Sequence, residues 1–400
     1  MRILMVSSQI PYPLRNGNQI YEYNLARHLS SRHELDLLAL ADAAEEGASL
    51  PAIEGFFRRT RLVVGRRTNH LRRLAALVAE GDILYNRDNV PMFRRALVEA
   101  LRDGYDAVQV NSLGLTPYAD LIGPVPKLAV PYDCQSLLYS RAAAQGSPWR
   151  AAYCRLQSSR LAFWERRWLP RYDRCVVVSQ VDATQLAARS RSLAVEVIPF
   201  GVDTEHFRPL DLPEEEATIV FTGNMTYFPN AQAARDLVHE ILPRIRQELP
   251  SARVRIVGDR TGRLNRELQG EGVEVVGFTD VRPHLAAATV CVSPLRIGAG
   301  FKNKVVEAMA MGKALVATPL SLDGIEATPG EHLLSAAEPA EIAAAVLRLL
   351  RDKALRRSLG DRARALVTQR YSWAQVAARF SSLYAALTDE CARVRRGMEA

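Results

Sequence analysis

Long hydrophobic runs and paired cysteines are missing from this sequence, and each absence excludes a class of protein. No uninterrupted apolar stretch approaches the roughly 20 residues that a membrane-spanning helix needs. The first residues also lack the pattern of a secretion signal, because Pro11 and Pro13 directly follow the first apolar run. The five cysteines are scattered, without metal-ligand spacing, which favours reduced thiols in a cytoplasm over disulfides or structural zinc.

Several catalytic motifs are missing as well. The chain has no Walker A sequence and no clean GxGxxG, which disfavours NTPases and dinucleotide-dependent oxidoreductases. It has no GxSxG and no HExxH, so a hydrolase would lack its nucleophile or its metal site. The seven histidines are dispersed and form no cluster.

Short apolar runs alternate with helical segments along the chain. A length of 400 residues, with 48% apolar and 24% charged residues, is typical of a soluble globular protein with two domains. The runs predict buried parallel strands, at residues 2–8, 35–40, 61–65, 106–110, 127–133 and 174–180 and again at 217–224, 253–259, 273–278, 289–294 and 314–318. This alternation predicts an α/β fold of two tandem Rossmann-like domains.

The boundary between the domains is predicted at the segment IPFGVDTEHFRPL, which contains two prolines and a glycine. The first domain then spans residues 1–198 and the second residues 199–370. Residues 371–400 are predicted to form a final helix that packs back toward the first domain.

The stretch 289–318, TVCVSPLRIGAGFKNKVVEAMAMGKALVAT, predicts a strand, a glycine loop, a short helix and another strand. The chain has only five lysines against 47 arginines, yet three lie between Lys302 and Lys313. Cations at a helix N-terminus oppose the helix dipole, so a phosphate in the loop would explain Lys302 and Lys304. Glu307, one turn later, would be the polar group nearest to that phosphate. A solvated basic loop and an exposed glutamate are the alternatives.

Other loops at the carboxyl ends of strands are candidates too, because ligands bind open α/β sheets there. Gly17 in the first loop and Gly223 with Asn224 after a strand allow the backbone to approach a phosphate closely. Asp133 ends a strand of the first half, where a carboxylate could accept a proton or bind a sugar hydroxyl. A turn-capping aspartate is the alternative.

Positive charge is concentrated in the first half of the chain. Residues 1–198 carry a net charge of +7, out of +8 in total. The densest part, Phe57–Ala79, has seven arginines, many apolar residues and no acid. Such a stripe is typical of contact with an anionic membrane or with nucleic acid, or is an ordinary arginine-rich surface. Because aromatic interleaving is missing, we expect no nucleic acid and predict peripheral contact with an anionic membrane. A longer helix, rich in arginine and aromatics, is predicted between Trp149 and Pro170.

The second half also contains an ordered series of motifs: FTGNMTYFPN, RVRIVGD, the stretch from VVGFTD at 275–280 to VAT at 316–318, and YSW at 371–373. Together with the first strand and PYPLRNGNQ, this series resembles the retaining glycosyltransferases of the GT-B fold, in the group 1 (family four) class of nucleotide-sugar enzymes. Within that class it most resembles the sugar transferases of bacterial exopolysaccharide and exosortase (PEP-CTERM) systems. The resemblance covers nearly the whole chain and implies an active site in the cleft between two domains.

The resemblance implies a role for each matching residue. Glu307 matches the glutamate that binds the ribose, and Lys302 and Lys304 lie in the loop that holds the diphosphate. The donor-binding residues are then Gly17, Gly223, Asn224, Gly277, Phe278, Gly300, Asn303 and Glu307. Catalysis is assigned to Lys302 and Lys304 at the donor and to Asp133 at the acceptor.

Three positions depart from the family pattern. Ala299 stands where the family has a glutamate that binds the donor sugar, so recognition of the sugar cannot be carried over. Asn224 replaces a common basic residue, which leaves the phosphate charge to the lysines. Tyr132 stands where a histidine often precedes Asp133.

The implied activity is transfer of a sugar, with retention, from a nucleotide sugar to a saccharide or lipid-linked saccharide in exopolysaccharide or cell-surface glycan synthesis. Lysines and a helix N-terminus would stabilise the leaving diphosphate, so no metal and no cofactor are expected. The enzyme would work in the cytoplasm, at the inner face of the membrane. A nucleotide-sugar epimerase and a non-catalytic protein of a polysaccharide-assembly complex are the alternatives.

Overall fold

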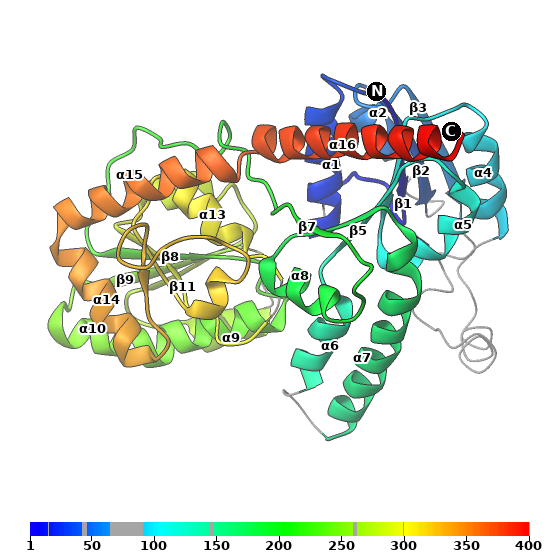
Figure 1. Ribbon diagram of the computed structural model, residues 1–400. Helices are drawn as coiled ribbons and strands as arrows, with labels where there is room; N and C mark the ends of the chain where they lie inside the picture. Colours follow the sequence, from blue (N-terminus) through cyan, green and yellow to red (C-terminus); the bar gives the residue numbers. More distant parts are fainter. Residues whose placement is uncertain are drawn as a thin grey trace. The chain divides into compact units, whose positions relative to one another are not determined.

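The computed structural model describes residues 1–14, 16–41, 46–64, 91–143, 148–258, 262–298 and 300–399 (Figure 1). The chain divides into two compact units, one formed by Met1–Pro199 with Val376–Ala400 and the other by Phe200–Gln375. The sequence places the corresponding divisions at 198/199 and 370/371. Each unit contains one parallel β-sheet flanked by helices, so the predicted α/β fold with two Rossmann-like domains is confirmed.

The first unit is built on a seven-stranded parallel sheet of order β3-β2-β1-β4-β5-β6-β7. Its strands are β1 (Arg2–Ser7), β2 (Glu34–Ala41), β3 (Arg59–Val64), β4 (Ala107–Asn111), β5 (Lys127–Tyr132), β6 (Arg174–Val177) and β7 (Val195–Val197). Leu4 and Val6 of β1 join a core with Phe93 and Leu97, while the alternate residue Met5 is also fully buried. Successive side chains of a strand point to opposite faces, so both faces of this sheet are covered.

The helices of the first unit connect these strands. They are α1 (Gly17–Leu29), α2 (Glu46–Ile53), α4 (Pro91–Leu101), a 3₁₀ turn (Leu113–Tyr118), α5 (Ala119–Ile122), α6 (Gln135–Ala143), α7 (Pro148–Trp168), a 3₁₀ turn (Leu169–Arg171) and α8 (Gln180–Ala187). The helix predicted between Trp149 and Pro170 is therefore α7. Figure 1 shows α6 and α7 side by side, with their far ends extending away from the sheet of this unit.

The second unit has a six-stranded parallel sheet of order β10-β9-β8-β11-β12-β13. Its strands are β8 (Thr218–Thr222), β9 (Arg253–Val257), β10 (Val273–Val276), β11 (Val290–Ser293), β12 (Leu315–Ala317) and β13 (Leu334–Ser335). Ile219 and Phe221 of β8 face one hydrophobic core, and Val220 between them faces another. This alternation buries β8, the strand beside β11, on both sides.

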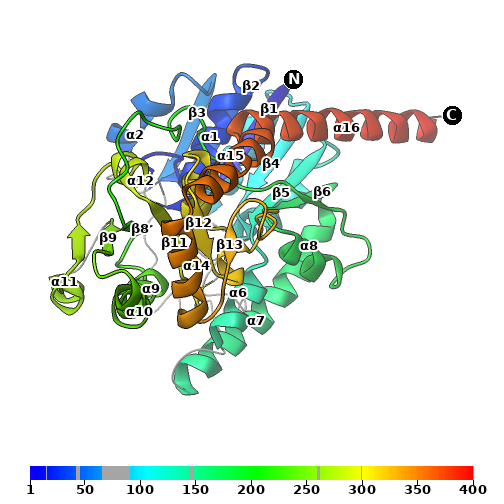
Figure 2. The ribbon, with the colours of Figure 1, turned by 90° about the vertical axis from the view of Figure 1, so that its left-hand side faces the viewer.

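Helices cover both faces of the second sheet (Figure 2). They are α9 (Phe228–Asp236), a π-helical segment (Leu237–Ile241), α10 (Leu242–Glu248), α11 (Gly262–Leu268), α12 (Arg282–Ala287), α13 (Asn303–Ala310), a 3₁₀ turn (Pro319–Leu322), α14 (Pro339–Arg351) and α15 (Lys353–Arg370). Gly360 lets α15 approach the turn after α13, because a Cβ at this position would lie 2.1 Å from the carbonyl oxygen of Gly312.

The last helix, α16 (Trp373–Glu399), begins in the second unit and continues in the first. In the second unit, a Cβ on Gly201 would lie 2.4 Å from the Trp373 ring. In the first unit, Tyr384 donates a hydrogen bond to Gln109 Oε1 and Phe380 lies edge-on to Tyr21. No helix among the described residues is both long and apolar enough to cross a membrane.

Candidate functional site

The glycine loop and α13 form the centre of the candidate donor site. Lys302 is the N-cap residue of α13, and the first turn of this helix contains no acidic residue. Gly300 has a φ of 77°, in the left-handed region that favours glycine. The sequence therefore forms the strand, loop and helix that the 289–318 stretch predicts, and the N-terminal peptide groups of α13 follow the loop.

Lys304 is held against the end of β8. Its Nζ donates a hydrogen bond to Asn230 Oδ1 at 2.6 Å and lies 4.5 Å from the centre of the Phe221 ring. Burial lowers the pKa of Lys304 to about 7, an effect that Glu307 opposes and Lys302 reinforces. A cation whose charge is disfavoured in this way would be stabilised by an incoming anion.

Glu307 lies one turn after Lys304 on the same helix. Burial raises the pKa of Glu307 to about 7, and the neighbouring Lys304 opposes that rise. The Glu307 side chain is only partly exposed, and Lys302 retains 8% of its accessible surface. The alternatives of a solvated basic loop and an exposed helical glutamate therefore do not describe these residues.

The remaining polar groups of the loop lie within the same short stretch. Lys302 donates a hydrogen bond from Nζ to the carbonyl oxygen of Gly300. Asn303 opens α13, and its Oδ1 is buried with no hydrogen-bond partner among the described residues. Ala299 lies outside the described residues, so the departure at that position has no structural account.

Gly223 is the point at which the backbone approaches Lys304. A Cβ on Gly223 would lie 2.7 Å from Lys304 Nζ and 3.0 Å from Asn230 Nδ2, so a larger side chain would displace the lysine. Asn224 is exposed, and its carbonyl oxygen accepts a hydrogen bond from Asn230 Nδ2 at 2.8 Å. Strands β8 and β11 lie where the strand order of the sheet reverses, which is where ligands bind in open α/β sheets.

Asn230 joins these segments, although the sequence did not single it out. It lies near the start of α9 and is 8% exposed. The motif FTGNMTYFPN contains both Asn230 and Phe221, but their contacts with Lys304 depend on a fold that brings together residues 74 and 83 positions apart.

Gly277 and Phe278 follow β10 at the far edge of the same sheet. The Phe278 side chain is 89% exposed, so it is available to a flat ligand. No contact joins it to Lys304 or Glu307 among the described residues, and its assignment to the base stays a prediction.

The predicted residues of the first unit lie at the carboxyl ends of two strands. Gly17 is the first residue of α1, whose N-cap Asn16 accepts a hydrogen bond from the Gln19 amide at 3.0 Å. Asp133 follows β5 and is partly exposed. The preceding Tyr132 has a φ of 68°, an unusual conformation for a tyrosine.

A buried carboxyl group near Asp133 is a feature that the sequence did not reveal. Glu22 of α1 accepts hydrogen bonds from Ser7 Oγ, at 2.6 Å, and from the Tyr132 hydroxyl. Burial raises the pKa of Glu22 to about 7, and its hydrogen bonds to Ser7, Tyr132 and Asn111 lower it in part. Glu22 therefore ties α1 to the carboxyl ends of β1, β4 and β5.

Two further carboxylates fix the loop that follows Asp133. Asp182 accepts a hydrogen bond from the Cys134 amide at 2.9 Å. Glu165 of α7 accepts hydrogen bonds from the Ser136 amide at 3.0 Å and from its hydroxyl at 2.6 Å, and pairs with Arg189 at 2.7 Å. This loop is therefore held by side chains from α7 and α8.

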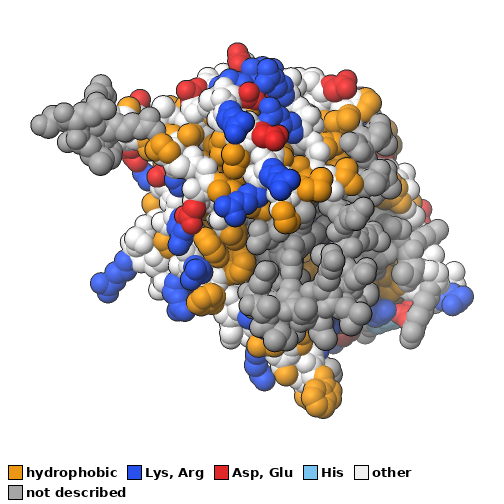
Figure 3. All heavy atoms as spheres, turned by 90° about the vertical axis from the view of Figure 1, so that its right-hand side faces the viewer, with side chains coloured by type: hydrophobic (Ala, Val, Ile, Leu, Met, Phe, Trp, Pro, Cys, Tyr) orange, Lys and Arg blue, Asp and Glu red, His pale blue; other side chains and the backbone are white. Residues whose placement is uncertain are grey.

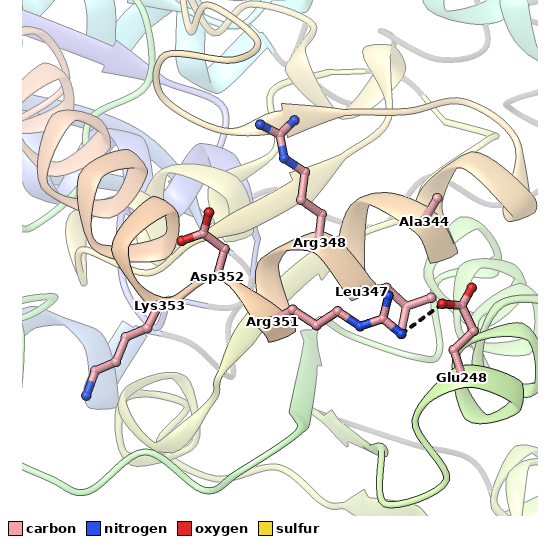
Figure 4. A pocket seen from close by; sticks show the side chains of 7 residues that line it. All are labelled: Glu248, Ala344, Leu347, Arg348, Arg351, Asp352 and Lys353. Atoms are coloured by element: carbon pink, nitrogen blue, oxygen red, sulfur yellow. Dashed lines mark hydrogen bonds and ion pairs between the residues drawn. The ribbon is translucent and has the colours of Figure 1, made fainter.

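A separate surface depression of about 640 Å³ lies on the second unit (Figure 4). It is lined by Glu248 of α10, four residues of α14, and Asp352 and Lys353. Arg351 and Glu248 form an ion pair of 2.8 Å across it. No residue predicted for the donor site lines this depression, and we assign no role to it.

Two family models match the chain. One, described as Glycosyltransferase Family 4, matches residues 15–206, and the other, described as Glycosyl transferases group 1, matches residues 216–352. The second match contains Gly223, Lys302, Lys304 and Glu307, and the first contains Gly17 and Asp133.

The chain is also similar to curated proteins. It is 28% identical over 243 residues to the phosphatidyl-myo-inositol mannosyltransferase of Mycobacterium tuberculosis (strain CDC 1551 / Oshkosh), which is 55% of this chain and 62% of that protein. The protein of that name from Mycolicibacterium smegmatis is 28% identical over 225 residues, 52% of this chain and 57% of its own length. These matches span less than two thirds of the length of the relatives.

Solved structures share the fold over nearly the whole chain. Sucrose-phosphate synthase from Thermosynechococcus elongatus superposes with a TM-score of 0.68 and 20% identity, over 98% of this chain and all of that chain. Anabaena Alr3699/HepE in complex with UDP superposes with a TM-score of 0.69 and 15% identity, over 96% of this chain and all of that chain. The two family models and this shared fold identify the chain as a glycosyltransferase with the two-domain GT-B fold of the group 1 and family 4 enzymes.

Proposed function

We propose that this glycosyltransferase moves a sugar, with retention of anomeric configuration, from a nucleotide sugar to a saccharide or lipid-linked saccharide in exopolysaccharide or cell-surface glycan synthesis. The second unit would bind the donor and the first unit the acceptor. The observation that carries the proposal is the partly buried Lys304, whose ammonium group lies beside Gly223 at the N-terminal end of α13 and whose pKa is lowered to about 7. A diphosphate at this position would add negative charge that favours the protonated lysine.

The donor would be bound through its two polar ends. Lys302, Lys304 and the amide groups at the start of α13 would hold the diphosphate, as helix N-termini commonly do. Glu307 would accept hydrogen bonds from ribose hydroxyls, one turn along the same helix. The side-chain oxygen of Asn303 is buried and has no hydrogen-bond partner among the described residues, so it would accept a further hydrogen bond from the nucleotide sugar.

Chemistry at the donor would break the bond between the anomeric carbon and the leaving diphosphate. The bond from the acceptor oxygen would form on the same face of the sugar, and the acceptor proton would pass to a phosphate oxygen. Lys302 and Lys304 would stabilise the negative charge that develops on the diphosphate, and no metal or cofactor would take part. Asp133 would bind and orient the acceptor hydroxyl.

Two similarities support the choice of substrates. The Anabaena structures contain UDP or UDP-glucose, which makes UDP-sugars the first donors to test. The mycobacterial relatives are named for transfer to a phosphatidyl-inositol, which supports an acceptor that resides in a membrane. We propose that the enzyme works at the cytoplasmic face of that membrane.

The test is acceptor-dependent release of nucleoside diphosphate from a panel of nucleotide sugars. We expect one nucleotide sugar to release its diphosphate faster when saccharide acceptors or acceptors from a lipid extract are added. A glycosylated acceptor should form in the same reaction. An isomerised nucleotide sugar formed without acceptor would instead indicate an epimerase. Failure to bind any nucleotide sugar would indicate a non-catalytic protein.

A further inference from the structure

Helix α7 carries large apolar side chains on the face that points away from the core. Its buried residues are Ala151, Cys154, Gln157, Leu161 and Glu165. The side chains of Trp149, Tyr153, Leu156 and Phe163 are each more than half exposed, Trp149 to 88%. Their spacings of four, three and seven residues place them in one stripe, because a helix repeats every 3.6 residues. Four large apolar side chains of α7 therefore face outward instead of joining the core.

The same stretch carries unbalanced positive charge. The arginines of α7 that form no ion pair with any described carboxylate are Arg150, Arg155, Arg160, Arg166 and Arg167. The one acidic residue of the helix, Glu165, is buried and paired with Arg189. In Figure 3, hydrophobic side chains lie at the lower end of the face, the level at which Figure 1 draws the start of α7, with Lys or Arg side chains beside them.

The basic stripe predicted at Phe57–Ala79 differs from α7, because the arginines in its described part form ion pairs. Arg58 pairs with Asp36 at 2.5 Å, and Arg59 and Arg61 both pair with Asp103 at 3.0 and 2.9 Å. Each of these three arginines therefore has a carboxylate partner within the unit, with two carboxylates shared among them. Residues 65–79, with the other four arginines of the stripe, lie outside the described residues.

We propose that the outward face of α7, formed by Trp149, Tyr153, Leu156 and Phe163 with the flanking Arg150, Arg155 and Arg166, docks on an anionic lipid surface. Tryptophan and tyrosine side chains favour the headgroup level of a bilayer, and arginines bind anionic headgroups while their stems cover apolar surface. A second copy of the chain fits this face poorly, because a two-fold interface would bring its arginines together. The proposal rests on the membrane-resident acceptor proposed above.

The test is co-sedimentation of the full chain with vesicles of phosphatidylcholine alone or with 30% phosphatidylglycerol, at low and high salt. We expect binding that requires the anionic lipid, weakens with salt, and shifts tryptophan fluorescence to the blue. The triple variant Arg150→Gln, Arg155→Gln, Arg166→Gln is expected to lose about a hundredfold in partition coefficient, about 1 kcal/mol for each arginine. The matched control replaces three exposed arginines of the second unit that form no ion pair with a described carboxylate, Arg244→Gln, Arg348→Gln and Arg362→Gln, and is expected to bind normally.

The apolar half of the surface is tested separately. Trp149→Ser with Phe163→Ser is expected to weaken vesicle binding at least tenfold and to remove most of the fluorescence shift. The control Met92→Ser with Leu212→Ser replaces two exposed apolar side chains elsewhere. It is expected to alter neither vesicle binding nor the fluorescence shift. Since all four side chains are exposed, folding should be preserved, and circular dichroism checks this.

Several outcomes would overturn the proposal. These are equal binding to both lipid mixtures, normal binding by both α7 variants, or a dimer in solution that Trp149→Ser dissociates. Sugar transfer to a short soluble acceptor is measured in parallel, because it does not need vesicles. Sugar transfer without vesicle binding would refute membrane docking through α7 but support the proposed function. Vesicle binding without sugar transfer would support docking through α7 but refute the proposed function.

Discussion

The substitution Lys304→Met tests whether Lys304 serves catalysis or the stability of the fold. The substitution keeps the length of the side chain but removes its charge. In the folded chain without diphosphate, burial lowers the pKa of Lys304 from 10.5 to about 7. A shift of that size corresponds to at most about 5 kcal/mol of disfavoured charge at neutral pH.

Two effects reduce that figure. The side chain is partly exposed, so solvent screens part of the charge, and methionine cannot replace the hydrogen bond to Asn230, which contributes about 1 kcal/mol. We therefore expect Lys304→Met to be more stable than the wild type by about 1–2 kcal/mol at pH 7. The unfolded lysine stays protonated up to about pH 10.5, so the stability of the wild type rises between pH 7 and 10.5 and the advantage of the variant disappears.

Activity should change in the opposite direction. A preordered cation beside a leaving group contributes on the order of 2–4 kcal/mol to the transition state, so the turnover of Lys304→Met should fall by a hundredfold or more. The assay combines urea unfolding at pH 7 and 9.5 with turnover of the donor. A variant that is less stable at pH 7 and keeps normal turnover would refute the placement of Lys304 at the diphosphate.

The other predictions concern residues around the two sites. Glu307→Gln should weaken binding of the free nucleoside diphosphate about tenfold or more by calorimetry, whereas unchanged affinity would remove Glu307 from the ribose. Lys302→Ala should lower turnover about a hundredfold while the protein stays folded; near-normal turnover would exclude Lys302 from the mechanism. Because the pKa of Glu22 is raised to about 7, the folded state keeps its proton between about pH 4.5 and 7 and loses stability as the pH rises through that range. Glu22→Gln should flatten this slope in unfolding curves measured from pH 4.5 to 7.5, and an unaltered slope would contradict the assignment.

The sequence predicted the architecture because its signals are local. Most of the long strands contain a short apolar run, and the glycines and lysines of the 289–318 stretch mark the loop before α13 within a few residues. Short elements were missed, since β7 and β13 have only three and two residues. Residues 339–370 form two helices, α14 and α15, because Asp352 caps α15 by accepting a hydrogen bond from the Leu355 amide at 2.8 Å.

The partners of the site residues could not be predicted in the same way. Lys304 meets Asn230 only because β8 and β11 are neighbours in the sheet. Glu22 lies between two tyrosines in the sequence and has the pattern of an ordinary helical position. Its burial depends on Tyr132, 110 residues away. Such contacts follow from the strand order, which a single sequence does not specify.

The most direct measurement is the time course, by proton NMR, of each UDP-sugar with the wild-type chain, with and without a lipid-linked saccharide acceptor. We predict that UDP appears only when acceptor is present and that the first glycosidic product has the anomeric configuration of the donor. Release of UDP at the same rate without acceptor, or a product of inverted configuration, would contradict retaining transfer to that acceptor.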